Sequence, residues 1–459
     1  MTYVPFARQS VGLDHRGYSQ ERALNWYARA FPTGASGELM LAPCPGFSKR
    51  KTIGAGDVRA MLALGVFLYI AAGGKLWRLN YNTGALTELG NIADDVATTM
   101  ATTGTDVAVC AGGGLRAWST DTASFHNPTA TLPFSDIGSV AAGDGYFVAT
   151  EITGKRFAYS GLNDARTWDA LDFYSAEADP DQIKRVVNAF QEFWIFGEST
   201  CEVWSVVGGS DVLSRNPGGV FDTGIAWKAS AVQLDDALYW VGDDKVVYRA
   251  RGYQPQRVSH EGVEALLQDY DEDDALKFFR YVWKGHSFYV IRFPDRPAWV
   301  YDTTTGLWHE RNTGADRADP WLACCATEWQ GVQVLGTPSG KVVNIGGLTD
   351  DGATIAREAV SVPFVVGDEY VTMRGLTAHL KTGETDLGRD AQVSLEVRRK
   401  TYDDWRTWSV ERWRSLGDGG EDKVARWHAL GRARGWQFRL RVTDPVETAL
   451  YGVTYDPAR

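Results

Sequence analysis

An internal repeat of about forty residues is the feature of this sequence that most constrains its fold. The stretch LYIAAGGKLWRLNYNTGAL, which begins at Leu68, aligns with VAVCAGGGLRAWSTDTASF, which begins at Val107, at an offset of 39 residues. The glycine pair at 73–74 falls on the pair at 112–113. Each unit reads as an apolar strand, a glycine turn, a second strand and a polar turn, which is typical of an antiparallel meander.

Looser copies of the unit follow along the chain and begin near Val140, Val186, Val232, Phe279 and Leu322. A spacing of roughly forty residues is the length of a four-stranded propeller blade. We count seven units, and six blades is the alternative if the first and last units share a blade with the N-terminal segment. The segment GELMLAPCPGF (37–47) is predicted to supply the strand that closes the ring.

The blade period is lost after about residue 355, where about seven strand patterns follow without it. In QFRLRV (437–442), three apolar residues alternate with Gln437, Arg439 and Arg441, so one face is predicted to be buried and the arginines exposed. We therefore predict an all-β chain with a β-propeller of about seven blades followed by a C-terminal β-sandwich. The predicted division is an N-terminal arm (1–19), a propeller (20–354) and a sandwich (355–459).

Two segments carry helical signals. SHEGVEALLQDY (259–270) has an apolar stripe, and Ser259 is predicted to cap it. SQERALNWYARA (19–30) is a second and weaker helix candidate.

Charge and composition exclude several classes of protein. The chain has 47 Lys and Arg against 58 Asp and Glu, a formal net charge of −11, so it lacks the basic footprint of a protein that grips nucleic acid. The N-terminal residues do not read as a signal peptide, and no run approaches the roughly 18 apolar residues of a membrane span. The five cysteines contain no C-x-x-C pair and are predicted to be reduced thiols of a chain made in a cytoplasm.

Three motifs resemble known sites but depart from them. DYDEDD (269–274) has Asp274 and Arg280 where a calcium loop needs Gly and Glu, so we interpret it as a solvated acidic turn. SGLNDARTW (160–168) and TYDDWRTW (401–408) resemble degenerate Asp-box turns without the central glycine. We interpret both as folding devices whose tryptophan packs inward.

The sequence contains no motif that supports catalysis. It has no phosphate loop, no G-x-S-x-G and no H-E-x-x-H, and none of the seven histidines has a metal-ligand partner at close spacing. We therefore predict that the chain is not an enzyme, with no catalytic residue, no cofactor and no metal site.

Five segments, in order along the chain, carry a resemblance to a known family: RALNWYARAFPTGASGELMLAPCPGF, WDALDFYSAEADPDQI, FGESTCEVW, GHSFYVIRFPDRPAWVYDTTTGLWHER and SVERWRSLGDGGEDKVARWHALGRARGWQFRLRVTDPV. Together they resemble the tail hub, or packaged-DNA stabilisation, proteins of short-tailed phages. The resemblance covers nearly the whole chain and carries over no catalytic motif.

The resemblance implies a structural protein of the virion tail that is made and assembled in the cytoplasm of the host bacterium. It implies a ring of six copies that forms a nozzle beneath the portal and its head-to-tail adaptor. The ring would close the DNA channel after packaging and anchor the tail needle or fibres, while genomic DNA passes through without specific binding.

Aromatic and arginine side chains are enriched at the centres of protein interfaces, and the C-terminal region is rich in both. We predict that its interface with a neighbouring subunit or the adaptor includes Arg398, Arg399, Arg406, Arg412, Trp413, Arg414 and Arg439.

The alternative from another class is a glycan-active or glycan-binding propeller protein of the tail. The 18 tryptophans and the two Asp-box-like turns favour it. A sialidase would also need three substrate-binding arginines and a nucleophilic tyrosine, and no local pattern identifies these residues.

Overall fold

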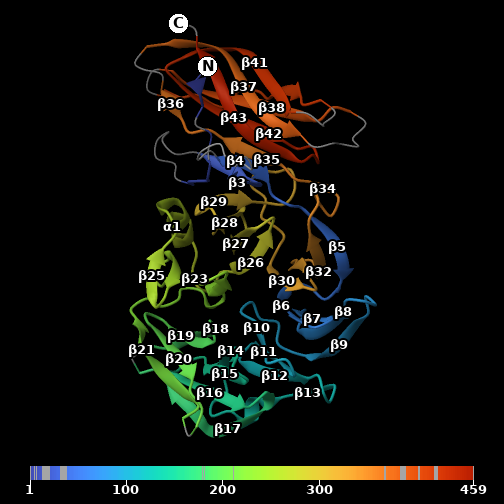
Figure 1. Ribbon diagram of the computed structural model, residues 1–459, viewed down its shortest axis with the longest axis vertical. Coiled ribbons are helices and arrows are strands. Elements are labelled where there is room, and N and C mark those ends of the chain that lie inside the picture. The colour runs from blue at the N-terminus through green and yellow to red at the C-terminus, as the bar shows by residue number, and fades with distance from the viewer. Residues whose placement is uncertain are drawn as a thin grey trace.

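The computed structural model describes residues 2–4, 6, 8–12, 21–30, 39–177, 179, 181–209, 211–365, 369–382, 389–401, 404–417 and 422–457. Most of the predicted N-terminal arm lies outside these residues. The regular secondary structure of the described part is almost entirely β-strand, with one α-helix, α1 (Glu261–Gln268), and two short 3-10 turns, η1 (Pro128–Thr131) and η2 (Lys228–Ser230). The prediction of an all-β propeller followed by a sandwich is confirmed (Figure 1).

Seven four-stranded blades stand around a common centre in Figure 1. The first four comprise β6 to β9 (Val58–Leu64, Phe67–Ala72, Lys75–Asn80, Leu86–Asn91), β10 to β13 (Thr99–Thr102, Asp106–Ala111, Gly114–Ser119, Ser124–His126), β14 to β17 (Ile137–Gly143, Tyr146–Glu151, Arg156–Gly161, Asp164–Ser175) and β18 to β21 (Ile183–Ala189, Glu192–Gly197, Cys201–Val206, Leu213–Phe221). The others comprise β22 to β25 (Val232–Leu234, Ala237–Val241, Val247–Arg251, Gln254–Arg257), β26 to β29 (Lys277–Trp283, His286–Arg292, Ala298–Asp302, Leu307–Arg311) and β30 to β32 (Cys325–Trp329, Val332–Gly336, Lys341–Ile345) with β5 (Phe47–Thr52).

The glycine pairs of the repeat form the turns between the second and third strands of the first two blades. Gly73 and Gly112 have φ values of 57° and 53°, in the left-handed region that side chains avoid. A Cβ atom on Gly73 would lie 1.6 Å from the carbonyl oxygen of Ala55, and one on Gly112 would lie 2.5 Å from the Cβ of Ala93. Both copies of the repeat therefore need glycine at this position, because each turn is left-handed and packs tightly against the linker that precedes its blade.

The outer strand of the seventh blade comes from the N-terminal part of the chain. β5 pairs antiparallel with β32, with Phe47 opposite Ile345 and Thr52 opposite Lys341, and so closes the ring. The prediction that residues 37–47 supply this strand is wrong, because Leu39–Pro43 forms β4, which pairs with β3 (Trp26–Ala30) in the sandwich. The apolar side chains of β4 need a buried face, whereas the polar sequence of β5 suits an exposed outer strand.

Each pair of neighbouring blades shares one cluster of buried apolar side chains, and seven such clusters complete the circle. Between the fourth and fifth blades, Trp194 and Trp240 are almost fully buried. Burying about 150 Å² or more of each ring contributes roughly 4 kcal/mol of transfer free energy. The seventh and first blades join through Trp329, which packs in the same cluster as Ile70.

The sandwich is built from both ends of the chain, around a separate core. One sheet has the order β3-β4-β43-β37-β41, and the other contains β2, β35, β42 and β38 with the short strands β36, β39 and β40. The remaining bounds are β1 (Thr2–Tyr3), β2 (Arg22–Leu24), β33 (Thr349–Asp350), β34 (Ala353–Thr354), β35 (Arg357–Val360), β36 (Phe364–Val365), β37 (Val371–Thr382), β38 (Gln392–Thr401), β39 (Asp404–Trp405), β40 (Arg412–Ser415), β41 (Asp422–Ala433), β42 (Gly435–Val442) and β43 (Thr448–Pro457).

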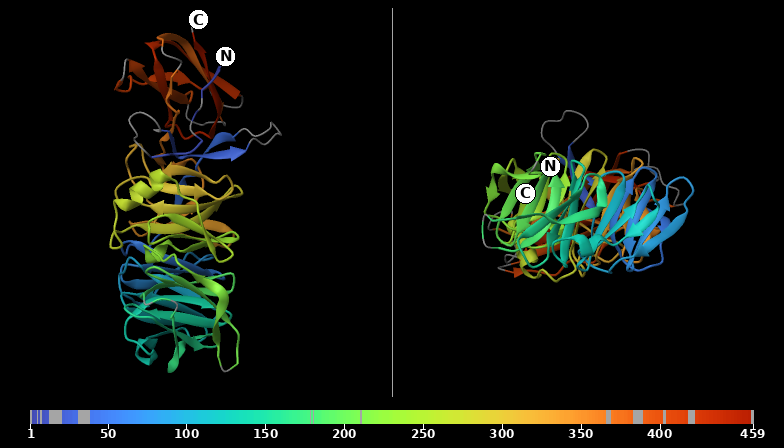
Figure 2. Two further views of the ribbon diagram at one scale, coloured as in Figure 1. Left: turned by 90° about the vertical axis from the view of Figure 1, so that its left-hand side faces the viewer. Right: turned by 90° about the horizontal axis from the view of Figure 1, so that it is seen from below.

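The sandwich continues the sixth blade outward from the rim of the propeller. Strand β2 pairs with β29, the outer strand of that blade, at Leu24 and Glu310, and with β35 on its other side. A single sheet thus runs from the propeller into the sandwich. The sandwich consequently extends the long axis of the molecule and does not cover a face of the propeller disc (Figure 2, left).

Both helix predictions need correction. The helix α1 exists, but its N-cap is His260, whose Nδ1 accepts a hydrogen bond from the Gly262 amide at 3.1 Å. The hydroxyl of Ser259 instead accepts from the Val247 amide. The described part of the second candidate, residues 21–30, contains strands β2 and β3 in place of a helix. Asn25 adopts a positive φ of 54° that breaks a helix, and Ala23 and Trp26 enter the sandwich core.

Candidate protein interface

The seven predicted interface residues lie on one sheet of the sandwich, on or beside strands β38, β40 and β42. The register places Ser394 of β38 opposite Trp413 of β40, and Glu396 of β38 opposite Arg439 of β42. Arg398 and Arg399 follow on β38, and Arg406 comes directly after β39. The structure brings these residues into one sheet but gives them different surroundings.

Arg412 and Arg414 bridge the two sheets of the sandwich. Arg412 donates to the carbonyl oxygen of His428 at 2.6 Å, and Arg414 donates to that of Arg426 at 2.8 Å. Both acceptors lie on β41, the strand at the edge of its sheet. The two guanidinium groups therefore satisfy outward-facing carbonyls that an edge strand would otherwise present to another chain.

Between these two arginines, Trp413 leaves 39% of its surface exposed. Val424 on the facing strand β41 is 45% exposed, and Val410 just before β40 is 87% exposed. Arg406 is also exposed, and its Nε donates to Thr401 at 2.8 Å. Exposed apolar and arginine side chains thus gather along this edge of the sandwich, the combination found at interface centres.

Arg439 is engaged within the chain. Its Nη1 lies 3.1 Å from a carboxylate oxygen of Glu396, and its guanidinium stacks 4.0 Å from the ring of Trp408. The expectation that the arginines of 437–442 are exposed is wrong for Arg439 and Arg441, which are largely covered, although the buried alternation of Phe438, Leu440 and Val442 is as predicted.

These contacts belong to an ion-pair network where the sandwich meets the propeller, which we call the junction network. Arg317, on the loop that follows β29, pairs with Glu358 of β35 and lies 2.6 Å from Glu396 of β38. Arg22 of β2 lies 2.7 Å from Glu310 of β29. Arg441 lies 3.3 Å from Glu411, and its Nη2 donates to Ala315 at 2.6 Å.

Sequence analysis missed this network because its partners are separated by up to several hundred residues. Arg22 and Glu310, like Glu396 and Arg439, lie on adjacent strands of the sheet, but 288 residues of chain separate the first pair and 43 separate the second. The alternating arginines of β42 offered the one available signal, since a charged row next to a predicted domain boundary can face the other domain as well as solvent.

A cavity of about 350 Å³ lies at the centre of the propeller. It is lined by the inner strands β6, β18, β22, β26 and β30 and by the segment before β10. Its basic residues include Arg59, Arg185 and Lys277, each within the first three residues of an inner strand. Because the inner strands of successive blades run in the same direction, these cations lie near one face of the disc.

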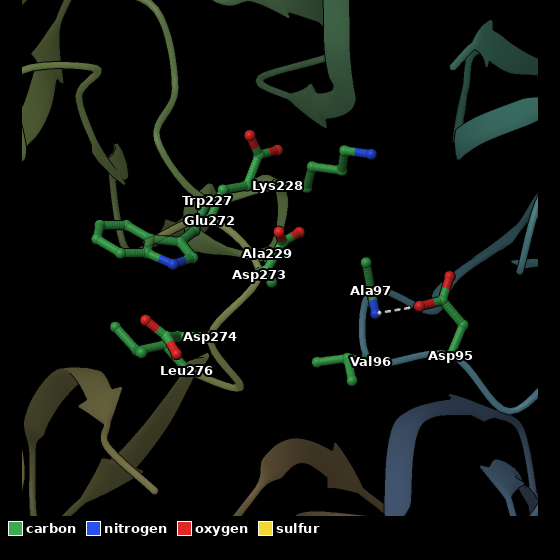
Figure 3. A pocket seen from close by; sticks show the side chains of 10 residues that line it. All are labelled: Asp95, Val96, Ala97, Trp227, Lys228, Ala229, Glu272, Asp273, Asp274 and Leu276. Carbon is green, nitrogen blue, oxygen red and sulfur yellow. Dashed lines mark hydrogen bonds between the residues drawn. The ribbon is translucent and has the colours of Figure 1, made fainter. Parts of the chain in front are cut away.

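A second cavity of about 290 Å³ adjoins the first, and the two share Val96 and Ala229 (Figure 3). Its lining is acidic and includes Asp95, Glu272, Asp273 and Asp274. The carboxylate of Asp95 accepts from the amides of Ala97 and Gly112, and Glu272 lies 2.6 Å from the ammonium of Lys184. The adjoining cavity thus has a mainly acidic lining with one lysine, Lys228, whereas the lining of the central cavity is basic.

The first Asp-box-like turn acts as a folding device. Asp164 accepts hydrogen bonds from the amide of Arg166 and the hydroxyl of Thr167, and Trp168 is 5% exposed and donates to Ala165 at 2.8 Å. Part of the second turn, residues 402–403, lies outside the described residues. The hydrogen bonds of Asp164 and Trp168 account for the residues of the first Asp-box-like turn without a bound ligand.

Three further properties of the described residues concern metal binding, membrane crossing and the reactivity of thiols. Within the described ranges, no three His, Cys, Asp or Glu side chains are grouped closely enough to hold a metal ion. The same residues include no helix with the length and apolar character needed to cross a bilayer. Burial raises the pKa of the thiols of Cys44 and Cys324 to about 11, so both are protonated at neutral pH.

Comparison with known proteins gives one family. A family model described as "Bacteriophage P22 Gp10, beta-propeller" matches residues 7–351. No curated protein matches the chain. Similar solved structures are the computationally designed Ika8 protein (15% identity, 74% of this chain and 100% of that chain, TM-score 0.41), the extracellular domain of the putative hybrid two component system BT4673 from B. thetaiotaomicron (11%, 84% and 44%, 0.36) and a chain of a Mitotic Checkpoint Complex (10%, 69% and 98%, 0.41).

Proposed function

We propose that the chain is the tail hub, or nozzle, of a short-tailed phage, because it belongs to the family described as "Bacteriophage P22 Gp10, beta-propeller". As a member of this family, it is a structural protein of the phage tail that stabilises packaged DNA. The observation that carries the proposal is the extent of the family match, residues 7–351, which spans all seven blades. The protein is a virion component, and we place its synthesis and assembly in the cytoplasm of the host bacterium.

We propose that six copies form a ring beneath the portal and its head-to-tail adaptor, and that the ring anchors the needle or fibres. The shape of the subunit supports this arrangement, since the sandwich projects from one point on the rim of the propeller (Figures 1 and 2). The continuous sheet from β26 to β38 and the junction network fix the direction of that projection. Such a subunit offers one binding region on the sandwich and another on the propeller, as a ring requires.

The edge of the sandwich is the surface that we assign to a neighbouring subunit or the adaptor. Trp413 and Arg414 are exposed there, and aromatic and arginine side chains dominate the binding energy of interfaces. Arg398, Arg399, Arg406 and Arg412 lie on the same sheet and stay in the proposed interface. Arg439 is removed from it, because Glu396 and Trp408 occupy its guanidinium.

We propose that genomic DNA passes along the ring without being gripped. Duplex DNA carries about one negative charge per 1.7 Å of its axis, so a strongly basic wall would hold it by many phosphate contacts. A formal net charge of −11 suits a wall from which DNA must leave.

The interface is tested by changing Trp413 and measuring assembly. Phage particles that lack the chain are complemented with Trp413→Ala, and the copies of the chain per particle are counted by quantitative mass spectrometry. We expect a loss of tenfold or more, since truncating an interface hot spot costs about 2 kcal/mol or more. Phe190→Ala, an aromatic residue of similar exposure on the fourth blade (42%), is the matched control and should assemble normally. Normal incorporation of the Trp413 variant would reject this surface.

A further inference from the structure

The central cavity contains a cation that the chain itself does not neutralise. Arg185 lies on the inner strand β18 and lines the cavity. Its Nε is buried, and no described residue accepts a hydrogen bond from it or forms an ion pair with it. Burial lowers the pKa of Arg185 to about 10, so it remains charged at neutral pH. Burying the Nε of a guanidinium without an anionic partner is costly, which indicates that another group completes the site.

Two more donors line the same cavity. The Nδ2 of Asn188, also on β18, is buried without a partner among the described residues. Lys277 on β26 is 5% exposed, and its ammonium donates to one acceptor among the described residues, the carbonyl oxygen of Val96 at 3.1 Å. An ammonium group carries three hydrogens, so it can donate further. The unsatisfied groups are therefore donors, and two of the three side chains are positively charged.

Several acidic groups near the cavity have other partners. Asp57 and Asp94 both pair with Arg59, at 3.0 Å and 2.8 Å, so they neutralise that arginine and not Arg185. In the adjoining cavity, Glu272 pairs with Lys184, and Asp274 accepts from the amide of Asp271. The described residues that line the cavity itself include Arg59, Arg185, Lys277 and Arg280 and no carboxylate, inside a chain whose formal net charge is −11.

We propose that the central cavity of the propeller is a binding site for a small oxyanion of the phosphate class, held by Arg185, Asn188 and Lys277. The planar guanidinium of Arg185 matches the geometry of two oxygens of such an anion. The anion would connect the inner strands of the fourth and sixth blades across the centre of the ring. This site is independent of the proposed role in the tail, because it lies within a single copy of the chain.

The test uses the full-length purified chain and inorganic phosphate as the probe. Thermal unfolding is followed in phosphate, acetate and chloride at equal ionic strength. At a phosphate concentration of about 100 times the dissociation constant, the unfolding midpoint should rise by roughly 3 °C relative to chloride. Acetate measures whether a carboxylate, such as the side chain of a partner protein, can replace phosphate, and a larger shift with acetate than with phosphate would reject the phosphate class.

Variants separate this site from the general effect of salts. Arg185→Met should abolish the phosphate shift and should unfold at or above the wild-type midpoint in chloride, since it removes an unpaired charge. Arg251→Met, the same change at an exposed arginine on the fifth blade, should keep the full shift. If Arg185→Met does not fold, Arg185→Lys keeps the charge but loses the planar fork, and phosphate affinity should fall about tenfold.

The line width of the phosphorus-31 resonance of phosphate provides a direct reading of binding. It should broaden with the wild-type chain and with Arg251→Met, and much less with either Arg185 variant. An unchanged thermal shift or unchanged broadening in the Arg185 variants would overturn the proposal.

Discussion

Ionisable side chains are buried where the sixth and seventh blades meet the sandwich. His309 is 2% exposed, and Arg311 is 1% exposed and stacks 4.0 Å from the ring of Trp321. Burial, together with the nearby charges of Arg311 and His286, lowers the pKa of His309 well below its ordinary value. The histidine is therefore neutral in the folded chain over the physiological range, and acidification must destabilise the fold at this residue.

Replacing His309 with glutamine should flatten the dependence of stability on pH. In the unfolded chain His309 takes up a proton below about pH 6.5, whereas in the folded chain it does not. The wild-type free energy of unfolding should thus lose up to about 1.4 kcal/mol per pH unit as the pH falls from 6.5 towards 5, and His309→Gln should lack this contribution. Urea denaturation at several pH values measures the difference in slope.

The matched control for that prediction is His428→Gln, because His428 is exposed on β41. Its slope should equal that of the wild-type chain. A His309 variant with an unchanged slope between pH 6.5 and 5 would show that the buried histidine does not couple folding to protons.

At the scale of strands, the period of the repeat predicts the blades because each blade is a local meander, paired within about forty residues. The closing strand β5 and the sandwich strands β2, β3 and β4 were not predictable in the same way. Strands β2, β4 and β5 pair with strands that lie more than 250 residues away, and no local pattern records such pairing. Strand β3 forms a local hairpin with β4, but this hairpin joins the sandwich through the contact of β4 with β43. Arg317 and Glu358 are only 41 residues apart, but they lie on opposite sides of the predicted domain boundary, so no strand pattern indicated their contact. For the same reason the sequence favoured an external interface for Arg439.

Removing the charge of different carboxylates in the junction network should lower the free energy of unfolding by different amounts. Glu358 is 1% exposed at its side chain and faces Arg22, Arg317 and Arg439, so Glu358→Gln should lower the free energy of unfolding by about 3 kcal/mol. Glu411, whose side chain is 27% exposed, should cost about 1 kcal/mol or less on the same change. Urea denaturation of both variants measures the contrast, and equal costs would contradict a junction held mainly by the buried carboxylate.

The division near residue 355 remains our proposal for the domain boundary, and limited proteolysis of the full chain tests it. We expect the first cut within Gly352–Thr354, which is exposed, and not at Asp350, which is 3% exposed and pairs with Phe47. The two fragments should elute together without denaturant, because β2 and β4 of one pair with β35 and β43 of the other. Fragments that separate freely would show that these pairings contribute little to cohesion.

At the scale of the whole molecule, the propeller and the sandwich form one elongated subunit, and we expect the purified chain to be largely monomeric. The guanidinium groups of Arg412 and Arg414 cover part of the edge strand β41, which reduces its tendency to pair with another copy. Sedimentation velocity measures the state in solution. A stable hexamer of the free chain would show that ring closure needs no template.

Binding to DNA should be weak and independent of sequence. The formal net charge of −11 opposes contact with phosphates, and acidic residues line the cavity that adjoins the cations of the central cavity. Fluorescence anisotropy with a labelled duplex at physiological salt measures the affinity. A dissociation constant in the micromolar range or tighter would contradict passage without gripping, even for a chain that forms the expected ring.

Image reconstruction of the virion, without imposed symmetry at the tail, tests the central claim most directly. The proposed role predicts a closed ring of six copies around the tail axis, directly below the adaptor, with the edge of the sandwich that carries Trp413 in contact with a neighbouring subunit or the adaptor. Density for this chain in the capsid lattice, at the tip of a fibre or inside the head would contradict it.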